Sequence, residues 1–206
     1  MEKIKAVLFD FDGVMTIDKT GTESICKYIS RNMGIDRNLF ETEYRKYNID
    51  LLIGKIKHED IWDNLCKNIG VNIPIKILHD SFIHTPIDND MYNLVKELKE
   101  KRYLTAMLTD NKIDRIKMIE KEFGFDKYFN AIIVSGEIGS GKDTKTIFLK
   151  ALDKLKIESK ESIFIDNQDR NLKVPQELGI KTIFYDDKER NIIGLKEKIK
   201  EYGIII

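Results

Sequence analysis

Residues 7–14 read Val-Leu-Phe-Asp-Phe-Asp-Gly-Val. The apolar run that begins at Val7 ends in Asp10, and Gly13 follows closely, which is typical of a fully buried strand that enters a turn. Residues two apart on an extended segment point to the same side, so Asp10 and Asp12 can face one crevice. Two carboxylates at such range share a proton or are neutralised by a cation. The stretch therefore predicts a buried strand with a charged turn at its carboxyl end.

Apolar runs and helical patterns alternate through the rest of the chain beyond Pro86. The spacing predicts strands over 104–108, 131–134, 162–165 and 182–185, and helices around 91–98 and over 113–123, 144–155, 172–178 and 192–202. Strands that alternate with helices of this length imply right-handed crossovers and a parallel sheet covered on both faces. We therefore predict an α/β fold with a doubly wound, parallel-sheet, Rossmann-like core.

The segment between these two regions has a different pattern. Apolar residues recur at helical spacing from Thr20 to Ile83, and no strand-like run interrupts them. Glycines and one proline punctuate the segment at Gly34, Gly54, Gly70 and Pro74. We expect two units, a core formed by residues 1–17 and 85–206 and a small inserted helical unit formed by residues 18–84.

Composition narrows the classes of function. The 35 basic and 35 acidic residues cancel, so the net charge gives no attraction for nucleic acid or an anionic membrane, and an anionic substrate must be bound locally. No apolar run approaches the roughly 20 residues that span a bilayer, and no export signal is evident, so we expect a cytoplasmic protein. Cys26 and Cys66 lack the close spacing of metal or redox sites, and we expect free thiols.

Polar residues follow the predicted strands at the sheet edge where ligands of such folds bind. The first strand ends in Asp10 and Asp12. The later ones lead to Thr109 and Asp110, to Ser135 and Lys142, and to Asp166. One site can collect all of these side chains. Because hard oxygen ligands with a third carboxylate at Asp166 favour Mg²⁺, a magnesium ion is the expected neutralising cation.

Four stretches in order resemble the motifs of the haloacid dehalogenase superfamily. Residues 7–14 are similar to the first motif, 108–111 (Leu-Thr-Asp-Asn) to the second, 135–142 to the approach to the third, and 164–171 to the fourth. The inserted segment lies where these enzymes place a helical cap, which identifies 18–84 as the predicted cap. Two positions depart from the pattern, since Asp143 replaces the usual proline after Lys142 and Asn167 replaces one of two adjacent acids.

The resemblance implies a Mg²⁺-dependent phosphatase that hydrolyses a small phosphorylated metabolite through a phosphoaspartate intermediate. Asp10 would be the nucleophile and Asp12 the proton carrier, with Thr109 and Lys142 holding the transferring oxygens. The implied phosphate-binding set is Asp12, Gly13, Thr109, Asp110 and Lys142. The implied metal ligands are Asp10, Asp12 through its main-chain carbonyl, and Asp166.

Several alternatives stay open at this point. A phosphomutase would use the same residues and differ in whether water reaches the phosphoenzyme. Residues 136–143 satisfy the G-x-x-x-x-G-K spacing of a phosphate-binding P-loop, but Asp143 stands where Ser or Thr is required, so nucleotide binding is a distant second. A non-catalytic interaction module is the alternative from a different class of function. It is suggested by Asn167, which stands where the motif has an acid.

Less specific expectations concern the predicted cap and the oligomeric state. We expect Trp62, Tyr44 and Tyr47 to pack between helices, and Arg45, Lys46 and His58 to be exposed. The apolar end of the chain, residues 204–206, can cover the core or a partner, so the oligomeric state stays open.

Overall fold

Five parallel strands form a sheet in the order β3-β2-β1-β4-β5, and the computed structural model describes residues 3–206. The strands are β1 (Ala6–Phe9), β2 (Leu104–Thr109), β3 (Ala131–Val134), β4 (Ser162–Asp166) and β5 (Lys181–Phe184). β1 lies in the middle, where its register pairs Phe9 with Met107 on one side and with Ile165 on the other. The predicted doubly wound parallel sheet is confirmed.

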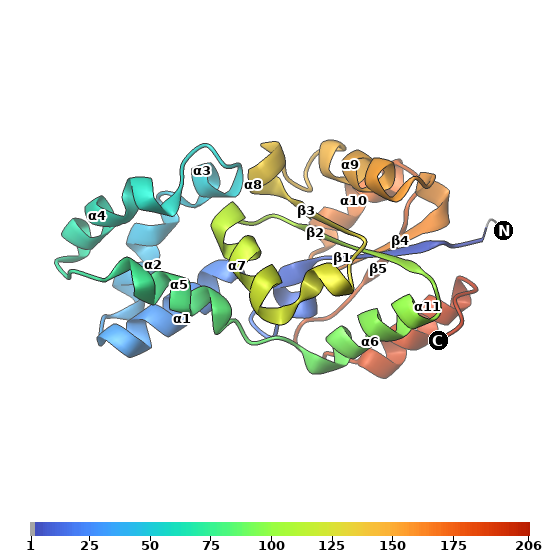
Figure 1. Cartoon of the computed structure of the whole chain (residues 1–206), viewed down its shortest axis with the longest axis horizontal. Coiled ribbons are helices and arrows are strands. Elements are labelled where there is room, and N and C mark those ends of the chain that lie inside the picture. The colour runs from blue at the N-terminus through green and yellow to red at the C-terminus, as the bar shows by residue number, and fades with distance from the viewer. Residues whose placement is uncertain (1–2) are drawn as a thin grey trace.

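Helices cover both faces of this sheet (Figure 1). Those of the core are α6 (Asn89–Glu100), α7 (Ile113–Phe123), α8 (Ser135–Ile138), α9 (Thr146–Leu155), α10 (Asp169–Glu177) and α11 (Ile192–Glu201), with short turns η1 (Phe11–Met15), η2 (Phe125–Lys127) and η3 (Ser159–Glu161). Val7 and Phe9 join one apolar cluster with α6, α7 and α11, whereas Ala6 and Leu8 join another with α9 and α10. This division follows from the two-residue period of a strand.

Element boundaries agree with the predicted ones to within three residues. β2 and β4 run one residue further than expected, so that Thr109 and Asp166 are the last residues of their strands. α10 begins at Asp169, three residues earlier than predicted, because the polar residues at its start carry no apolar periodicity. The strands therefore deliver their terminal polar residues directly to the edge of the sheet.

Five helices lie between β1 and α6 in the chain and extend beyond the carboxyl ends of the strands (Figure 1). They are α1 (Gly21–Met33), α2 (Arg37–Arg45), α3 (Asn48–Leu52), α4 (His58–Ile69) and α5 (Ile75–Ile83), called the inserted helices below. The chain enters and leaves them side by side, since Thr16 and Ile87 form an antiparallel bridge and the Ile17 amide donates to the Pro86 carbonyl (2.8 Å). The predicted boundaries between the core and the inserted unit, after residue 17 and after residue 84, lie at this crossing.

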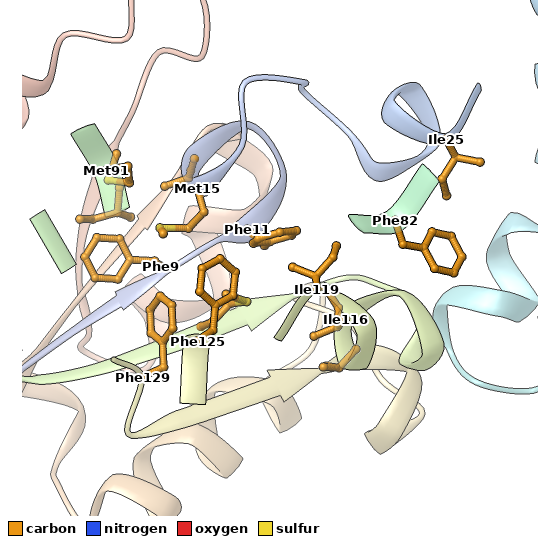
Figure 2. Packing of buried hydrophobic residues seen from close by; sticks show 14 of the residues in the cluster. Phe9, Phe11, Met15, Ile25, Phe82, Met91, Ile116, Ile119, Phe125 and Phe129 are labelled. Carbon is orange, nitrogen blue, oxygen red and sulfur yellow. The ribbon is translucent and has the colours of Figure 1, made fainter. Parts of the chain in front are cut away.

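One apolar cluster runs without interruption from the sheet into the inserted helices (Figure 2). Phe9, Phe125 and Phe129 pack edge to face under β1, with ring centroids 5.8–6.3 Å apart. Ile25 and Phe82, from α1 and α5, belong to the same cluster at its other end. Because separating the inserted helices from the core would expose this apolar surface to water, burial holds the two parts together.

A buried polar chain also links the inserted helices to the core. His58, the first residue of α4, is 1% exposed, so the expectation that it is exposed was wrong. Its Nδ1 donates to Asp114 Oδ2 at the start of α7 (2.5 Å), and its Nε2 lies 2.7 Å from the Tyr44 hydroxyl. The His58 ring is covered by Phe82 and stacked on Tyr44, so packing between helices removes it from water. Tyr44 and Trp62 are buried as expected, and Arg45 and Lys46 are exposed.

The end of α3 and the loop that follows it approach the core backbone closely. Ser135 Oγ donates to the Leu52 carbonyl (2.6 Å), and a Cβ atom on Gly54 would lie 1.9 Å from the Gly136 carbonyl oxygen. Gly54 also has a φ of +68°, which side chains rarely adopt. Only glycine fits this contact.

Gly54→Ala is expected to lower the free energy of unfolding by about 2–4 kcal/mol, of which about 1 kcal/mol comes from the left-handed backbone and the rest from the clash. The control is Gly34→Ala, because Gly34 has a similar φ of +65° with no atom within 4 Å of an added Cβ. Urea unfolding of both variants measures the difference. Equal losses in the two variants would contradict the close approach of Gly54 to Gly136.

The link through Asp114 predicts a loss of stability in acid. Burial opposes ionisation of Asp114, but the hydrogen bond and charge of His58 outweigh it and hold the pKa of Asp114 below its usual range. Because the pKa of Asp114 is lower in the folded than in the unfolded chain, the ionised carboxylate stabilises the protein above the unfolded pKa of about 4. The protein loses this stabilisation as the pH falls through the folded-state pKa. Asp114→Asn should therefore cost about 1–2 kcal/mol at neutral pH, with the difference shrinking below about pH 4.

Denaturant unfolding at several pH values measures this difference. The matched control is Asp63→Asn, which makes the same change at an exposed carboxylate of α4 and should leave the stability within about 0.5 kcal/mol at every pH. The free energy of unfolding should differ less between wild type and Asp114→Asn in acid than at neutral pH. A difference that stays the same in acid would show that the carboxylate does not stabilise the contact as an anion.

Candidate active site

A polar cavity of about 210 Å³ lies where the carboxyl ends of the strands meet the inserted helices. Its floor comes from the residues that follow β1, β2 and β4, and Thr22, Arg45 and Asn48 of the inserted helices form one of its walls. Of the predicted site residues, five line this cavity together: Asp10, Asp12, Thr109, Asp110 and Lys142. Adjacent parallel strands end at one edge, which is why residues so distant in sequence meet there.

The centre of the site is a lysine between two carboxylates. Lys142 Nζ lies 2.6 Å from Asp10 Oδ1 and 2.7 Å from Asp166 Oδ2, and all three side chains are at most 5% exposed. Asp166 lies behind the cavity wall, where Asn171 Nδ2 donates to both of its oxygens (3.1 Å each) and the Gln168 amide donates to Oδ1 (2.8 Å). These donors hold Asp166 in place beside Lys142.

The charges of this group do not balance. Burial and the nearby Asp166 carboxylate raise the pKa of Asp10 well above its usual value, against the opposing effect of Lys142. Burial opposes the charge of Lys142 as well, but Asp10 and Asp166 outweigh it and raise the pKa of its ammonium. Two buried carboxylates thus share one ammonium, an arrangement that a further cation would stabilise.

The second carboxylate of the first motif is held by a different cation. Arg115 is fully buried, and its Nη2 and Nη1 donate to the two oxygens of Asp12 at 2.8 and 2.9 Å. Asn111 Nδ2 also donates to Asp12 Oδ2 (2.6 Å), and Asn111 Oδ1 accepts from Arg115 (3.0 Å). The expected crowding of Asp10 against Asp12 is therefore relieved, since Asp12 pairs with Arg115 while Asp10 contacts Lys142.

Arg115 and Asn111 were missed by the sequence reasoning. Arg115 stands four residues before Ile119 on the inward face of α7, and an arginine on the buried stripe of a helix is a signal that could have identified it. Gly21 at the start of α1 packs on the same pair, because a Cβ there would lie 2.5 Å from Arg115 Nη1 and 3.0 Å from Asp12 Oδ2. The inserted helices thus contact the Asp12–Arg115 pair directly.

The remaining predicted residues lie as follows. Thr109 is buried at the end of β2 with its Oγ1 accepting from Asn111 Nδ2 (3.1 Å). Asp110 Oδ1 accepts from the Lys142 amide (2.9 Å), which fixes the backbone of the loop that carries the lysine. Gly13 does not line the cavity, and its amide donates to Thr16 Oγ1 (2.9 Å).

The P-loop alternative does not match the geometry of residues 136–143. Residues Ser135–Ile138 form the short helix α8 instead of an open loop, and Lys142 is engaged by Asp10 and Asp166. Asp143 is exposed. The segment therefore supplies a lysine to the carboxylate site and forms no phosphate cradle of its own.

The residues present fit a magnesium ion. Within residues 3–206 no three Asp, Glu, His or Cys side chains converge as a metal cluster, but the expected set needs only two carboxylates, Asp10 and Asp166, and the main-chain carbonyl of Asp12. The excess of negative charge around Lys142 favours a cation there. Asn167, which replaces the expected acid, donates to Asp187 (2.8 Å), and its buried Oδ1 has no partner in the described part of the chain.

No helix in the described chain is long and apolar enough to cross a membrane. Cys26 and Cys66 are free thiols, as expected, and both are buried.

Several known proteins are similar to this chain in sequence or in structure. A glyceraldehyde 3-phosphate phosphatase from Methanopyrus kandleri is 25% identical over 87% of this chain and 83% of its own length. A bifunctional epoxide hydrolase 2 from Sus scrofa is 24% identical over 98% of this chain, which spans only about two fifths (39%) of that relative. The structure of a haloacid dehalogenase family enzyme from Bacteroides thetaiotaomicron, solved with magnesium and inorganic phosphate, is 25% identical with a TM-score of 0.69, covering 88% of this chain and 94% of that one.

The family model of the haloacid dehalogenase-like hydrolases matches residues 4–196. This match covers the sheet, the four motif regions and the inserted helices in a single span. The chain therefore belongs to the haloacid dehalogenase-like hydrolase family.

Proposed function

We propose that this protein is a Mg²⁺-dependent phosphatase that hydrolyses a small phosphorylated metabolite through a phosphoaspartate at Asp10. The observation that carries the proposal is the separation of two carboxylates in one cavity, Asp10 beside Lys142 and Asp12 beside Arg115. Separate cationic partners let each carboxylate take its own role, Asp10 as nucleophile beside Lys142 and Asp12 as proton carrier beside Arg115. The phosphatase among the relatives and the phosphate-bound structure of the Bacteroides enzyme support phosphate as the group transferred.

In the first step an oxygen of Asp10 attacks phosphorus, and the bond from phosphorus to the leaving oxygen breaks. Asp12 gives its proton to that oxygen, so the product leaves as a neutral alcohol. Asp12 Oδ2 accepts two hydrogen bonds, from Arg115 and Asn111, whereas Oδ1 accepts one, from Arg115. Oδ1 thus keeps a free lone pair and is the oxygen that carries the proton.

In the second step Asp12, now a carboxylate, takes a proton from water as the water oxygen attacks the phosphorus of the phosphoaspartate. The acyl phosphate bond breaks and regenerates Asp10. Thr109 Oγ1 and the main-chain amide near Asp110 would hold the phosphoryl oxygens, and the Lys142 ammonium would stabilise their charge. Bound Mg²⁺, held by Asp10, the Asp12 carbonyl and Asp166, would supply the charge that lets an anionic nucleophile approach a phosphate.

The inserted helices would act as the cap of this site. They supply Thr22 and Asn48 to the wall of the cavity, and the Thr22 hydroxyl donates to Asn48 Oδ1 (3.3 Å). A wall on that side limits both the size of the substrate and the entry of bulk water. The small polar cavity suits a metabolite better than a folded phosphoprotein.

Asp10→Asn is expected to lower turnover of p-nitrophenyl phosphate by about 10³-fold or more, because the amide is a poor nucleophile while the fold is kept. The measurement is steady-state hydrolysis with Mg²⁺ and again with EDTA, which should also abolish wild-type turnover. Asp153→Asn, on the exposed face of α9, should behave as wild type. Unchanged turnover in Asp10→Asn would remove Asp10 as the nucleophile.

Arg115→Lys is expected to impair the proton transfer that Asp12 performs, since lysine keeps the charge but loses the two-pronged contact that orients the carboxylate. Phenyl phosphate should lose at least about tenfold more kcat/KM than p-nitrophenyl phosphate, because a more basic leaving oxygen depends more on the proton. Asp12→Asn should show the same pattern. An equal loss on both substrates would mean that Arg115 only supports the fold.

A further inference from the structure

Lys112 occupies an unusual position at the wall of the cavity. It precedes α7 directly, is 3% exposed, and lines the same cavity as Asp10 and Thr109. Its ammonium makes no hydrogen bond or ion pair with any residue from 3 to 206, and it lies over the face of the Tyr44 ring, 5.6 Å from the centroid. The Tyr44 hydroxyl is directed to His58, so it does not serve the ammonium.

The two other buried cations around the cavity have counterions, whereas Arg170, which also lines the cavity, is exposed and makes no ion pair within residues 3–206. Lys142 is paired with Asp10 and Asp166, and Arg115 is paired with Asp12. At the cavity mouth Arg45 pairs with Glu41 (2.5 Å) and Lys19 with Asp187 (3.4 Å). Lys112 is thus a buried cation without the counterion that such a group requires.

Burial and the neighbouring Arg115 lower the pKa of Lys112 to about 8. The ammonium therefore stays largely protonated at neutral pH, at a cost to stability that the described residues do not offset. A ligand with an anionic group at this point would supply the missing counterion.

Lys112 also borders a second cavity of about 380 Å³, which lies between the α3–α4 loop and the start of α7 and includes Leu51 and Ile56 in its lining. The phosphoryl group in the proposed reaction occupies the floor of the first cavity, between Asp10 and Thr109. Lys112 lies at the boundary between the two cavities, on the side of the inserted helices, where the leaving group of a substrate would extend.

We propose that Lys112 makes the site selective for phosphate monoesters that carry a second anionic group, a carboxylate or a second phosphate, a few bonds from the phosphorylated oxygen. This inference rests on the proposed phosphatase function and names its substrate class. The ammonium is the counterion of that second group and takes no part in the transfer itself. Lys142 and Thr109 hold the transferred phosphoryl group.

Three two-carbon probes test the proposal: 2-hydroxyethyl phosphate, phosphoglycolate and 1,2-ethanediol bisphosphate. They share a short chain and differ in carrying a hydroxyl, a carboxylate or a second phosphate. For wild type, kcat/KM on one or both anionic probes should exceed that on 2-hydroxyethyl phosphate by at least about tenfold, the size of a charge-assisted hydrogen bond. The better of the two anionic probes identifies the second group.

Three variants test whether Lys112 is the source of this preference. Lys112→Met should bring the ratio of anionic to neutral probe close to one, and Lys112→Arg should keep most of it. Lys121→Met is the matched control, because Lys121 is exposed on α7 and lines neither cavity, and its ratio should equal that of wild type. A uniform loss on all three probes in Lys112→Met would place the ammonium on the transferred phosphate and overturn the proposal.

Stability provides a second readout. Without ligand, Lys112→Met should raise Tm at pH 7, because it removes a buried charge that has no counterion. Between pH 8 and 10.5 the unfolded chain keeps a proton that folded Lys112 has lost, so wild-type stability rises with pH and the difference shrinks. The charged or titratable groups facing Lys112 are Arg115 and Asp114 of α7, Asp12 of η1, Cys26 of α1 and Tyr44 of α2. A fall in Tm would identify Lys112 as structural and overturn the proposal.

The outcomes separate this inference from the proposed function. Wild-type hydrolysis of p-nitrophenyl phosphate without preference among the three probes would overturn the inference alone. If wild type hydrolyses none of the phosphates, the phosphatase proposal fails, and the same three probes are compared by calorimetric Kd. Equal Kd values for the three would then overturn the inference as well.

Discussion

The pairing of one buried ammonium with two buried carboxylates is the interaction on which the site depends. β1 and β4 are neighbours whose register sets Phe9 beside Ile165, so the next residues, Asp10 and Asp166, come out side by side. Two like charges in a dry environment repel, and Lys142 between them offsets only part of that repulsion. The donors around Asp166 and the contact of Asp110 with the Lys142 amide serve to hold this group in one geometry. The remaining negative charge is what makes the site suited to a divalent cation.

A single helix start connects the site to the inserted helices. The residues from Lys112 to Arg115 at the beginning of α7 send side chains to three places: Lys112 toward the Tyr44 ring, Asp114 to His58, and Arg115 to Asp12. Two of these partners belong to the inserted helices and one to the first motif. A change in the position of the inserted helices therefore reaches Asp12 through α7 and through Gly21, which packs on the same ion pair. This coupling links cap geometry to proton transfer in the proposed mechanism.

Apolar burial provides the framework for these polar contacts. The cluster that includes Phe9 and Phe11 continues to Ile116 of α7 and on to Phe82 of α5, so core and inserted helices share one packed interior. Arg190 adds a polar anchor at the crossing between the two parts, where it binds Asp88 (2.8 Å) and the carbonyls of Gly13 and Val14. Rigid packing of this kind holds a polar site in one arrangement, because close-packed interiors do not deform continuously.

The sequence by itself determined the sheet, the order of its helices and the residues at the strand ends. Apolar runs such as Val7–Phe9 and the helical spacing of α7 depend on local periodicity, which a single chain displays openly. Parallel strands then had to bring Asp10, Asp12, Thr109, Asp110 and Lys142 to one edge. Only the tertiary structure decided the partners of these residues. Contacts between segments far apart in the chain bury His58, pair Arg115 with Asp12 and leave Lys112 without a counterion. No local sequence pattern specifies which charged groups face each other. That choice depends on how α7 and the inserted helices pack, because the free energy of a buried charge is set by the groups around it in space.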